Sequence, residues 1–258
     1  MAIITLISDW GNKDYYTAAV KGKIYKLFPE ARVVDITHEI PAFDKEQAAY
    51  ILKNAARSFP EGTVHIIGIN TEESSKRPHA VAYYEKQYFV GTDNGIFSLI
   101  FDKEPDKVVV LDIPHEGDQF SFSSRDRFVA AAVHLARGGD MTELGEEKKD
   151  IEHKILFKPI EDDHTIKGQV VYIDRYGNLI TNISKKLFTE KVRHRKFTIS
   201  LRSGKATRID MAYEDVPPGE VVALFASDGM LEIAINKGNA ATLLGIDRKF
   251  PVIVEIVQ

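Results

Sequence analysis

A short polar segment in the second half of the chain carries side chains suited to binding a small ligand. Asp174, Tyr176 and Asn178 lie between two apolar, β-branched runs, 170–173 and 179–183. The pattern predicts strand, turn, strand. Because Asn178 and the glycine before it tolerate positive φ, the turn can be tight while a carboxylate, a ring and an amide project from it. These groups match an amine and a purine; the alternative is a hairpin whose polar residues only satisfy the turn.

A second set of candidate residues follows the first two predicted strands. Asp9 comes directly after the apolar run 3–7, and Phe43 lies in the loop after the run 31–36. Open α/β sheets bind ligands at the carboxyl ends of their strands, so Asp9 is placed to accept hydrogen bonds from ribose hydroxyls and Phe43 to stack on a base. The alternative for Asp9 is a helix-capping aspartate. His38, with no orienting neighbour recognised in the sequence, is predicted to be a hydrogen-bonded loop histidine.

The elements that position the first set of loops alternate between strand and helix. Apolar runs predict strands at 3–7, 31–36, 64–69, 80–84, 87–90 and 108–111, and helical spacing predicts helices at 15–28, 44–57 and 128–137. This alternation predicts a layered α/β domain with a largely parallel sheet.

The composition changes between residues 141 and 167, where charged residues dominate and periodicity is lost. We predict a linker there, between an N-terminal domain at 1–140 and a C-terminal domain at 168–258. The second part has no long helical pattern, and its short β-branched runs predict a small β-barrel. These runs are 169–173, 179–183, 197–201, 221–225, 231–235 and 252–257.

Composition narrows the class of function. The chain has 258 residues, of which 44% are hydrophobic, and it has no cysteine, which excludes thiolate catalysis and cysteine–zinc sites. With 34 basic and 38 acidic residues there is no basic field for nucleic acid. No apolar run approaches the roughly 18 residues of a membrane span, and no secretory signal pattern opens the chain. We therefore expect a cytoplasmic protein with a small-molecule substrate and neither a nucleic acid nor a membrane as partner.

Several groups of residues spread over nearly the full length match, in order and spacing, the motifs of one family. They are Ser8-Asp9-Trp10-Gly11 with Asp14-Tyr15, Asp35-Ile36-Thr37-His38-Glu39-Ile40-Pro41, Thr92-Asp93-Asn94-Gly95, Arg125-Asp126, Tyr172-Ile173-Asp174-Arg175-Tyr176-Gly177-Asn178 with Thr181-Asn182, and Leu231-Glu232-Ile233-Ala234 with Asn236. On these residues the chain resembles the S-adenosyl-L-methionine (SAM) hydroxide adenosyltransferases, relatives of the fluorinating and chlorinating enzymes.

The resemblance implies a fold, an assembly and a reaction. It implies an N-terminal α/β domain and a C-terminal β-barrel that associate as a homotrimer, with the ligand between one subunit's first domain and a neighbour's second. The reaction implied is substitution at the ribose 5′ carbon of SAM by water, giving adenosine and L-methionine, with no metal and no cofactor beyond SAM as substrate. The binding roles implied are Asp9 for the ribose diol, Phe43 beside the ligand, Asp174 for the methionine ammonium, Tyr176 and Asn178 for adenine, and Ser227 for the methionine carboxylate.

The chain departs from the hydrolases' pattern at the residues that orient water. Gly68 stands where they have an aspartate and Ser123 where they have a histidine, while their arginine corresponds to Lys76 or Arg77. With no carboxylate–histidine pair left to tune a water, hydrolysis should lack a histidine-like titration near neutral pH. An inflection there would instead implicate an overlooked histidine, the candidates being His38, His79 and His115.

Neutral donors are the remaining candidates for the chemistry. Ser124 matches a halide-contacting serine of the fluorinating relatives and Thr71 a nearby threonine, so these hydroxyls with Arg77 are predicted to hold water or a small anion at the 5′ carbon. The alternative is that both hydroxyls only cap loops. Three functions therefore remain open: a slow SAM hydrolase, a related transferase that uses another nucleophile such as halide, and a noncatalytic binder of SAM or adenosine.

Overall fold

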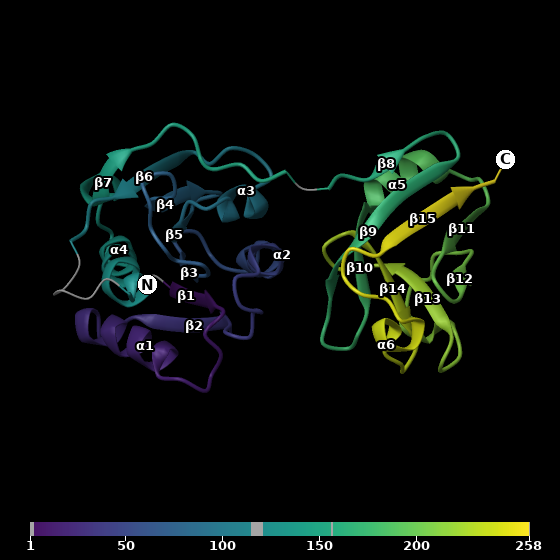
Figure 1. Ribbon diagram of the computed structural model, residues 1–258, viewed down its shortest axis with the longest axis horizontal. Helices are drawn as coiled ribbons and strands as arrows, with labels where there is room; N and C mark the ends of the chain where they lie inside the picture. The colour runs from purple at the N-terminus through teal and green to yellow at the C-terminus, as the bar shows by residue number, and fades with distance from the viewer. Residues whose placement is uncertain (1–2, 115–120, 156, 258) are drawn as a thin grey trace. The chain divides into compact units, whose positions relative to one another are not determined.

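The computed structural model describes residues 3–114, 121–155 and 157–257 and forms two compact units, Met1–Ile155 and Leu156–Gln258 (Figure 1). Each unit is described by itself. The segment 141–167, predicted as a linker, contributes short elements to both units. A 3-10 helix, η2 (Met141–Leu144), and strand β7 (Gly145–Glu147) belong to the first unit, and β8 (Ile160–Glu161) belongs to the second.

The described part of the first unit holds a mixed sheet in the order β2-β1-β3-β5-β4-β6-β7. Strands β2, β1, β3 and β5 pair in parallel. The tight hairpin from β4 to β5 makes that pair antiparallel, and β6 and β7 add further antiparallel pairings beyond β4. The expected layered α/β class is confirmed. The bounds are β1 (Ile3–Ser8), β2 (Arg32–Thr37), β3 (Val64–Gly68), β4 (His79–Tyr84), β5 (Gln87–Thr92) and β6 (Lys107–Leu111).

Helices cover both faces of this sheet (Figure 1). One core cluster contains buried residues of α1 (Tyr16–Leu27) and α4 (Val129–Ala136), and the other contains those of α2 (Lys45–Ala56) and α3 (Ile96–Ile100). Helix α2 begins where Asp44 caps it, because this carboxylate accepts the Gln47 N–H at 3.0 Å. The two layers leave the carboxyl ends of β1, β2 and β3 to the loops that carry the candidate residues.

The second unit is an antiparallel barrel-like sheet in the order β12-β11-β15-β9-β10-β14-β13, with β8 pairing beside β9. Its inward side chains form one core, whose buried members include Ile166, Leu231 and Val254. The expected barrel is therefore confirmed. The bounds are β9 (Thr165–Ile173), β10 (Leu179–Ser184), β11 (Phe197–Ser200), β12 (Lys205–Ala206), β13 (Val221–Phe225), β14 (Met230–Ile235) and β15 (Pro251–Ile256).

Short helices in the second unit were not predicted from the sequence. Helix α5 (Lys185–Val192) begins where the Ser184 hydroxyl accepts the Leu187 N–H at 3.2 Å, and it buries Phe188 and Val192, four residues apart, against the barrel. One buried stripe of two residues is too short a pattern to distinguish from a turn in the sequence. Helix α6 (Ala240–Leu244) and the 3-10 helix η3 (Tyr213–Asp215) are shorter still.

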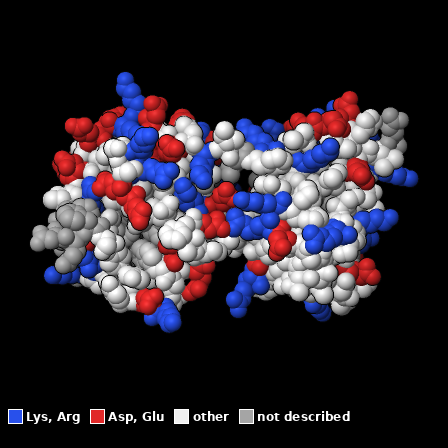
Figure 2. All heavy atoms as spheres, in the orientation of Figure 1, with Lys and Arg blue, Asp and Glu red and all other residues white. Residues whose placement is uncertain are grey.

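Charged side chains of both signs are interspersed on the face of each unit in view in Figure 2. The formal net charge is −4. Among the described residues, no helix is both long enough and apolar enough to cross a membrane.

Candidate functional site

The structure brings together Asp9 and Phe43, which are far apart in sequence. Asp9 follows β1, and its carboxylate accepts the backbone N–H of Phe43 at 2.8 Å. Phe43 has a φ of 66° and leaves 71% of its surface exposed. Burial raises the pKa of Asp9, and the hydrogen bond from Phe43 opposes part of that rise. Asp9 is not the cap of α1, because that helix is preceded by Tyr15 and has no side-chain cap.

Trp10 occupies the space that a side chain at position 68 would need. Gly68 ends β3 and lies opposite Ser8 in the parallel register. A Cβ on Gly68 would lie 2.8 Å from Cη2 and 2.9 Å from Cε2 of the Trp10 indole, closer than real Cβ atoms come. The indole also packs edge-on against Phe122, with ring centroids 5.8 Å apart. Gly68 is therefore matched by Trp10, in the loop that follows the neighbouring strand β1.

A carboxylate and a histidine do lie close together at the end of β2. Asp35 Oδ1 lies 3.1 Å from Nε2 of His38, which is 3% exposed. The prediction that no carboxylate–histidine pair tunes the attacking water concerns positions 68 and 123, and it stays a prediction. His38 is a hydrogen-bonded loop histidine, as predicted. The D-x-x-H spacing at the end of β2 was the sequence signal for this pair. His115 lies outside the described residues.

Buried polar contacts hold the loop that carries Thr71. The Thr71 carbonyl lies 2.8 Å from Nε2 of His79, and the Glu73 carboxylate accepts from Arg127 Nη1 at 2.5 Å. Arg127 also donates to the Leu111 carbonyl at 2.6 Å. Burial acts to raise the pKa of Glu73, but His79 and Arg127 outweigh it and the pKa is lowered. These contacts tie the loop to the segment that contains Ser124.

Arg77 lies in a tight turn of the same loop. Its N–H donates to the Ser74 carbonyl at 3.0 Å, and its side chain is exposed. Burial, Lys154 and Arg77 together lower the pKa of Lys45. The guanidinium of Arg77 is thus close enough to act on the first residue of α2, which follows Phe43 by two positions.

Ser124 opens a π-helical turn, η1 (Ser124–Phe128), that runs into α4. Its side chain is 1% exposed, and among the described residues its Oγ has no hydrogen-bond partner. In the same turn Arg125 makes two hydrogen bonds to the buried Asp126 carboxylate, at 2.6 and 2.9 Å. π-Helical turns are rare and are frequent at functional sites, and a buried hydroxyl without a partner is a feature that bound water or a ligand explains.

In the second unit, the predicted strand–turn–strand forms around Asp174. Its carboxylate accepts the N–H groups of Tyr176 at 2.9 Å and Asn178 at 2.8 Å, and the Asn178 side-chain amide at 3.1 Å. Gly177 is required, because its φ is 83° and the Asn239 side chain fills the place of a Cβ. The acid and the amide thus satisfy the turn, and Tyr176 remains 77% exposed.

Glu232 is a further candidate that sequence reasoning did not single out. It is buried on β14, and its carboxylate accepts the Tyr213 hydroxyl at 2.8 Å. Burial, opposed by Tyr213 but supported by Asp174 and Asp228, raises the pKa of Glu232. Burial and Glu232 raise the pKa of Tyr213 to about 12. Ser227 lies beside Asp228 in the turn before β14. Asp228, Asp174 and Glu232 form an acidic group that favours a cation.

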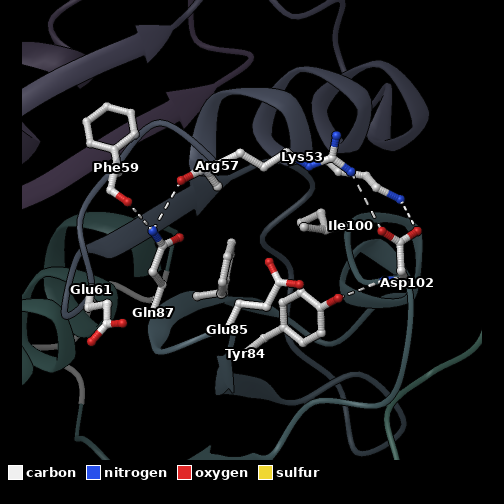
Figure 3. Close-up of a pocket in the computed structure, with 11 residues that line it drawn as sticks. Lys53, Arg57, Phe59, Glu61, Tyr84, Glu85, Gln87, Ile100 and Asp102 are labelled. Carbon is white, nitrogen blue, oxygen red and sulfur yellow. Dashed lines mark hydrogen bonds and ion pairs between the residues drawn. The ribbon is translucent and has the colours of Figure 1, made fainter. Parts of the chain in front are cut away.

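A separate cavity of about 170 Å³ lies at the other end of the first unit's sheet (Figure 3). It is at the amino ends of β3 and β5, where Gln87 donates to the Phe59 carbonyl at 2.8 Å. On its rim Lys53 is hydrogen-bonded to Asp102, and Arg57 lies 3.7 Å from the same carboxylate. This cavity is not part of the arrangement around Asp9.

Both units match profiles of one protein family. The profile of the SAM hydroxide adenosyltransferase N-terminal domain matches residues 4–145, and that of the C-terminal domain matches residues 168–253. The chain belongs to the SAM hydroxide adenosyltransferase family.

Relatives of known name in this family align along almost the entire chain. An (R)-S-adenosyl-L-methionine hydrolase of Thermus thermophilus is 31% identical, covering 98% of this chain and 99% of its own. One of Methanocaldococcus jannaschii is also 31% identical, with 95% and 92% covered. A fluorinase of Nocardia brasiliensis is 25% identical, with 93% and 92% covered.

Solved structures share the fold. The crystal structure of an uncharacterized conserved protein from Thermotoga maritima superposes with a TM-score of 0.89 at 27% identity, covering 98% of this chain and 99% of its own. A conserved hypothetical protein from Thermus thermophilus gives a TM-score of 0.77 at 29% identity and full coverage of both chains. Both solved structures thus share the folds of the α/β unit and of the barrel with this member of the SAM hydroxide adenosyltransferase family.

Proposed function

We propose that the protein binds (R)-S-adenosyl-L-methionine and hydrolyses it to adenosine and L-methionine. The observation that carries the proposal is the pairing of Asp9 with Phe43. It consists of a half-buried carboxylate, held by a backbone N–H beside an exposed ring, at the carboxyl end of a parallel strand. This is where such sheets take nucleotides, and a carboxylate accepts two vicinal hydroxyls well. The relatives named hydrolases, aligned over both units, support the choice of substrate.

The proposed reaction is a substitution at one carbon. The oxygen of water bonds to the ribose C5′ while the C5′–S bond breaks, its electron pair goes to sulfur to give the neutral thioether of methionine, and the water's proton leaves to solvent. Because a sulfonium is already a good leaving group, holding water in line supplies much of the acceleration. Without acid–base help, typically worth about 10²–10⁴-fold, the enzyme should be slow.

Each predicted site residue has a proposed role in this reaction. Thr71, Ser124 and Arg77 hold the attacking water, and we choose Arg77 over Lys76 because its charge reaches Lys45 beside Phe43. The proposed substrate contacts are Asp9 with the ribose, Phe43, Tyr176 and Asn178 with the adenosine, and Asp174 and Ser227 with the methionine. The acidic group that contains Glu232 adds attraction for the ammonium and the sulfonium. No metal takes part.

We further propose that the protein is a homotrimer whose site lies at a subunit interface. The support is that the proposed contacts are divided between two separately folded units, each with an exposed aromatic side chain, Phe43 and Tyr176. Light scattering with and without adenosine tests this proposal. A monomer that still binds adenosine would contradict it.

Product analysis tests the function. Purified protein is incubated with (R)- and (S)-SAM separately, and adenosine and methionine are quantified by chromatography. We expect adenosine from the (R) epimer, and at least about tenfold less from Asp9→Asn, because the neutral amide loses charge-assisted acceptance. Asp163→Asn, at an exposed aspartate of the second unit, is the matched control. The proposal would be refuted if no product formed and if neither SAM nor adenosine shifted the melting temperature. Binding without turnover would identify a noncatalytic binder.

A second candidate is a transferase that uses a small anion. The observation that favours it is the buried Ser124 hydroxyl, which has no partner among the described residues. Repeating the incubation with chloride distinguishes the two, because the transferase forms 5′-chloro-5′-deoxyadenosine while the hydrolase forms only adenosine. Loss of the chlorinated product in Ser124→Ala would assign the anion to this hydroxyl.

A further inference from the structure

A hydroxyl, an imidazole and a carboxylate form a chain next to the segment that carries Asp9. Ser8 Oγ lies 2.6 Å from Nδ1 of His38, and Nε2 of His38 lies 3.1 Å from Asp35 Oδ1. Ser8 is fully buried and His38 is 3% exposed. The three residues come from the ends of β1 and β2 and the loop after β2, so the chain crosses the two parallel strands that present the candidate site.

Donors and acceptors in this chain can be assigned from chemistry. Asp35 also accepts Lys21 Nζ at 2.5 Å; burial acts to raise its pKa, but Lys21 and His38 outweigh this and lower it, so Asp35 is a carboxylate that only accepts. Nε2 of His38 must therefore carry the proton. In the neutral ring Nδ1 then accepts the Ser8 O–H, which leaves Ser8 Oγ free to accept the Trp10 N–H at 3.5 Å.

His38 also holds the residues on either side of Asp9. Its backbone carbonyl accepts the Gly11 N–H at 2.8 Å, and its ring stacks on the Trp10 indole at 6.1 Å between centroids and 14° between planes. Together with the bond to Ser8, these contacts clamp the positions just before and just after Asp9. Nδ1 of His38 is hydrogen-bonded to Ser8, and the buried Nε2 faces the Asp35 carboxylate at 3.1 Å without an aligned hydrogen bond, so His38 acts on the site through its neighbours.

We propose that His38 is a positioning residue for ligand binding, acting through Ser8 and Trp10 to hold Asp9 where its carboxylate accepts the ribose hydroxyls. The inference rests on the proposed function for the identity of the ligand, but the clamp itself does not depend on it. The consequence is that ligand affinity depends on the neutral form of His38. A second proton, on Nδ1, points at the Ser8 hydroxyl. That hydroxyl can then no longer donate to the ring and has to turn toward another acceptor.

The charged groups that face His38 are few. Asp35 is in contact with it, Lys21 of α1 binds the same carboxylate, and Asp9 follows the Ser8 that it binds. Glu39, the next residue along the loop, is engaged by the Asn12 side chain at 2.8 Å.

Trp10 provides a direct readout of this clamp. It is the single tryptophan of the chain, and it stacks on His38. An imidazolium stacked on indole quenches its fluorescence, whereas a neutral imidazole does so much less. The intrinsic fluorescence of the ligand-free protein should therefore change as His38 takes a proton.

The experiment compares wild type, His38→Gln, His38→Asn and Ser8→Ala, with His134→Gln on α4 as the matched histidine control. Far-UV circular dichroism and thermal unfolding establish that each variant is folded. Tryptophan fluorescence is titrated with pH without ligand, and adenosine affinity is measured by calorimetry over the same pH range. The side-chain amide of His38→Gln takes the place of Nε2, which faces Asp35, and that of His38→Asn takes the place of Nδ1, which binds Ser8. The two variants therefore separate the two contacts of the imidazole.

We expect the fluorescence inflection in wild type and His134→Gln and its loss in both His38 variants. We expect adenosine to bind about three- to tenfold more weakly to His38→Gln and Ser8→Ala, the cost of one lost hydrogen bond, with His38→Asn recovering part of the loss. Folded His38→Gln that binds adenosine as tightly as wild type, or keeps the inflection, overturns the inference. No adenosine binding by wild type overturns the proposed function, while the ligand-free titration still reports on the clamp.

Discussion

The buried His65 should make the first unit unstable in mild acid. His65 is fully buried on β3, with Nδ1 2.7 Å from the Thr5 hydroxyl and Nε2 3.0 Å from Gln87 Oε1. The Gln87 amide nitrogen donates to the carbonyls of Ala56 and Phe59, the latter labelled in Figure 3. The amide oxygen therefore accepts from His65. Nε2 therefore donates and Nδ1 accepts from Thr5 in the neutral ring. A second proton on Nδ1 would place a charge in a buried site and make the Thr5 hydroxyl give up its present hydrogen bond.

The sign and size of the effect follow from the pKa of His65. Burial, opposed by the hydrogen bond to Gln87, lowers it from 6.5 to about 4. The unfolded chain therefore takes up the proton first as pH falls, and stability is lost between pH 6.5 and about pH 4. At about 1.4 kcal/mol per pH unit, the full loss is about 3 kcal/mol, and about 2 kcal/mol of it is reached near pH 5.

Urea unfolding followed by Trp10 fluorescence measures this loss, because the only tryptophan lies in the same unit as His65. The free energy of unfolding is compared at about pH 8 and about pH 5 for wild type, His65→Gln and the control His134→Gln. Wild type and control should lose about 2 kcal/mol more than His65→Gln on acidification. Equal losses in wild type and His65→Gln would refute the reasoning, whatever the absolute stability of the variant.

Three other predictions concern the candidate site. Gly68→Ala should cost about 1–3 kcal/mol in urea unfolding, because the methyl meets the indole, and Trp10→Phe in the same chain should recover most of it; additive costs would contradict the packing argument. Tyr213→Phe should cost about 1–3 kcal/mol in thermal unfolding, since Glu232 then lacks its donor; an unchanged melting temperature would mean that Glu232 is otherwise satisfied. Burial raises the pKa of Asp9, so as the pH is lowered adenosine affinity should begin to fall at a higher pH than the pKa of an ordinary aspartate would give. Calorimetry on Asp9→Asn should give a profile without that fall.

Local sequence was sufficient for most of the elements. The sequence predicted β1, α1, β2 and α2 to within a residue or two. Both strands are rich in β-branched residues, α1 and α2 bury residues at helical spacing, and α2 has a capping aspartate. The same holds for β13 and β14 in the barrel. Residue order and spacing also sufficed for the family, which the profile matches to both units then established.

The order and direction of strands depended on tertiary structure. The sequence predicted a largely parallel sheet, but β4 lies between β5 and β6 and makes that half antiparallel. The β4–β5 hairpin uses Glu85 and Lys86, both with positive φ, instead of the asparagine and glycine that would signal such a turn. Neighbouring strands, not turn chemistry, hold these residues in place.

The site illustrates the same division between local and long-range information. From the sequence, Asp9, Phe43 and the turn around Asp174 could be identified as polar or aromatic groups at loop ends. Only the fold pairs Asp9 with the Phe43 N–H and sets the Trp10 ring over Gly68. These contacts join segments separated by tens of residues, and their geometry follows from the register of β1 against β2 and β3. A one-dimensional pattern records which side faces a core, but it does not record which strand lies next to it.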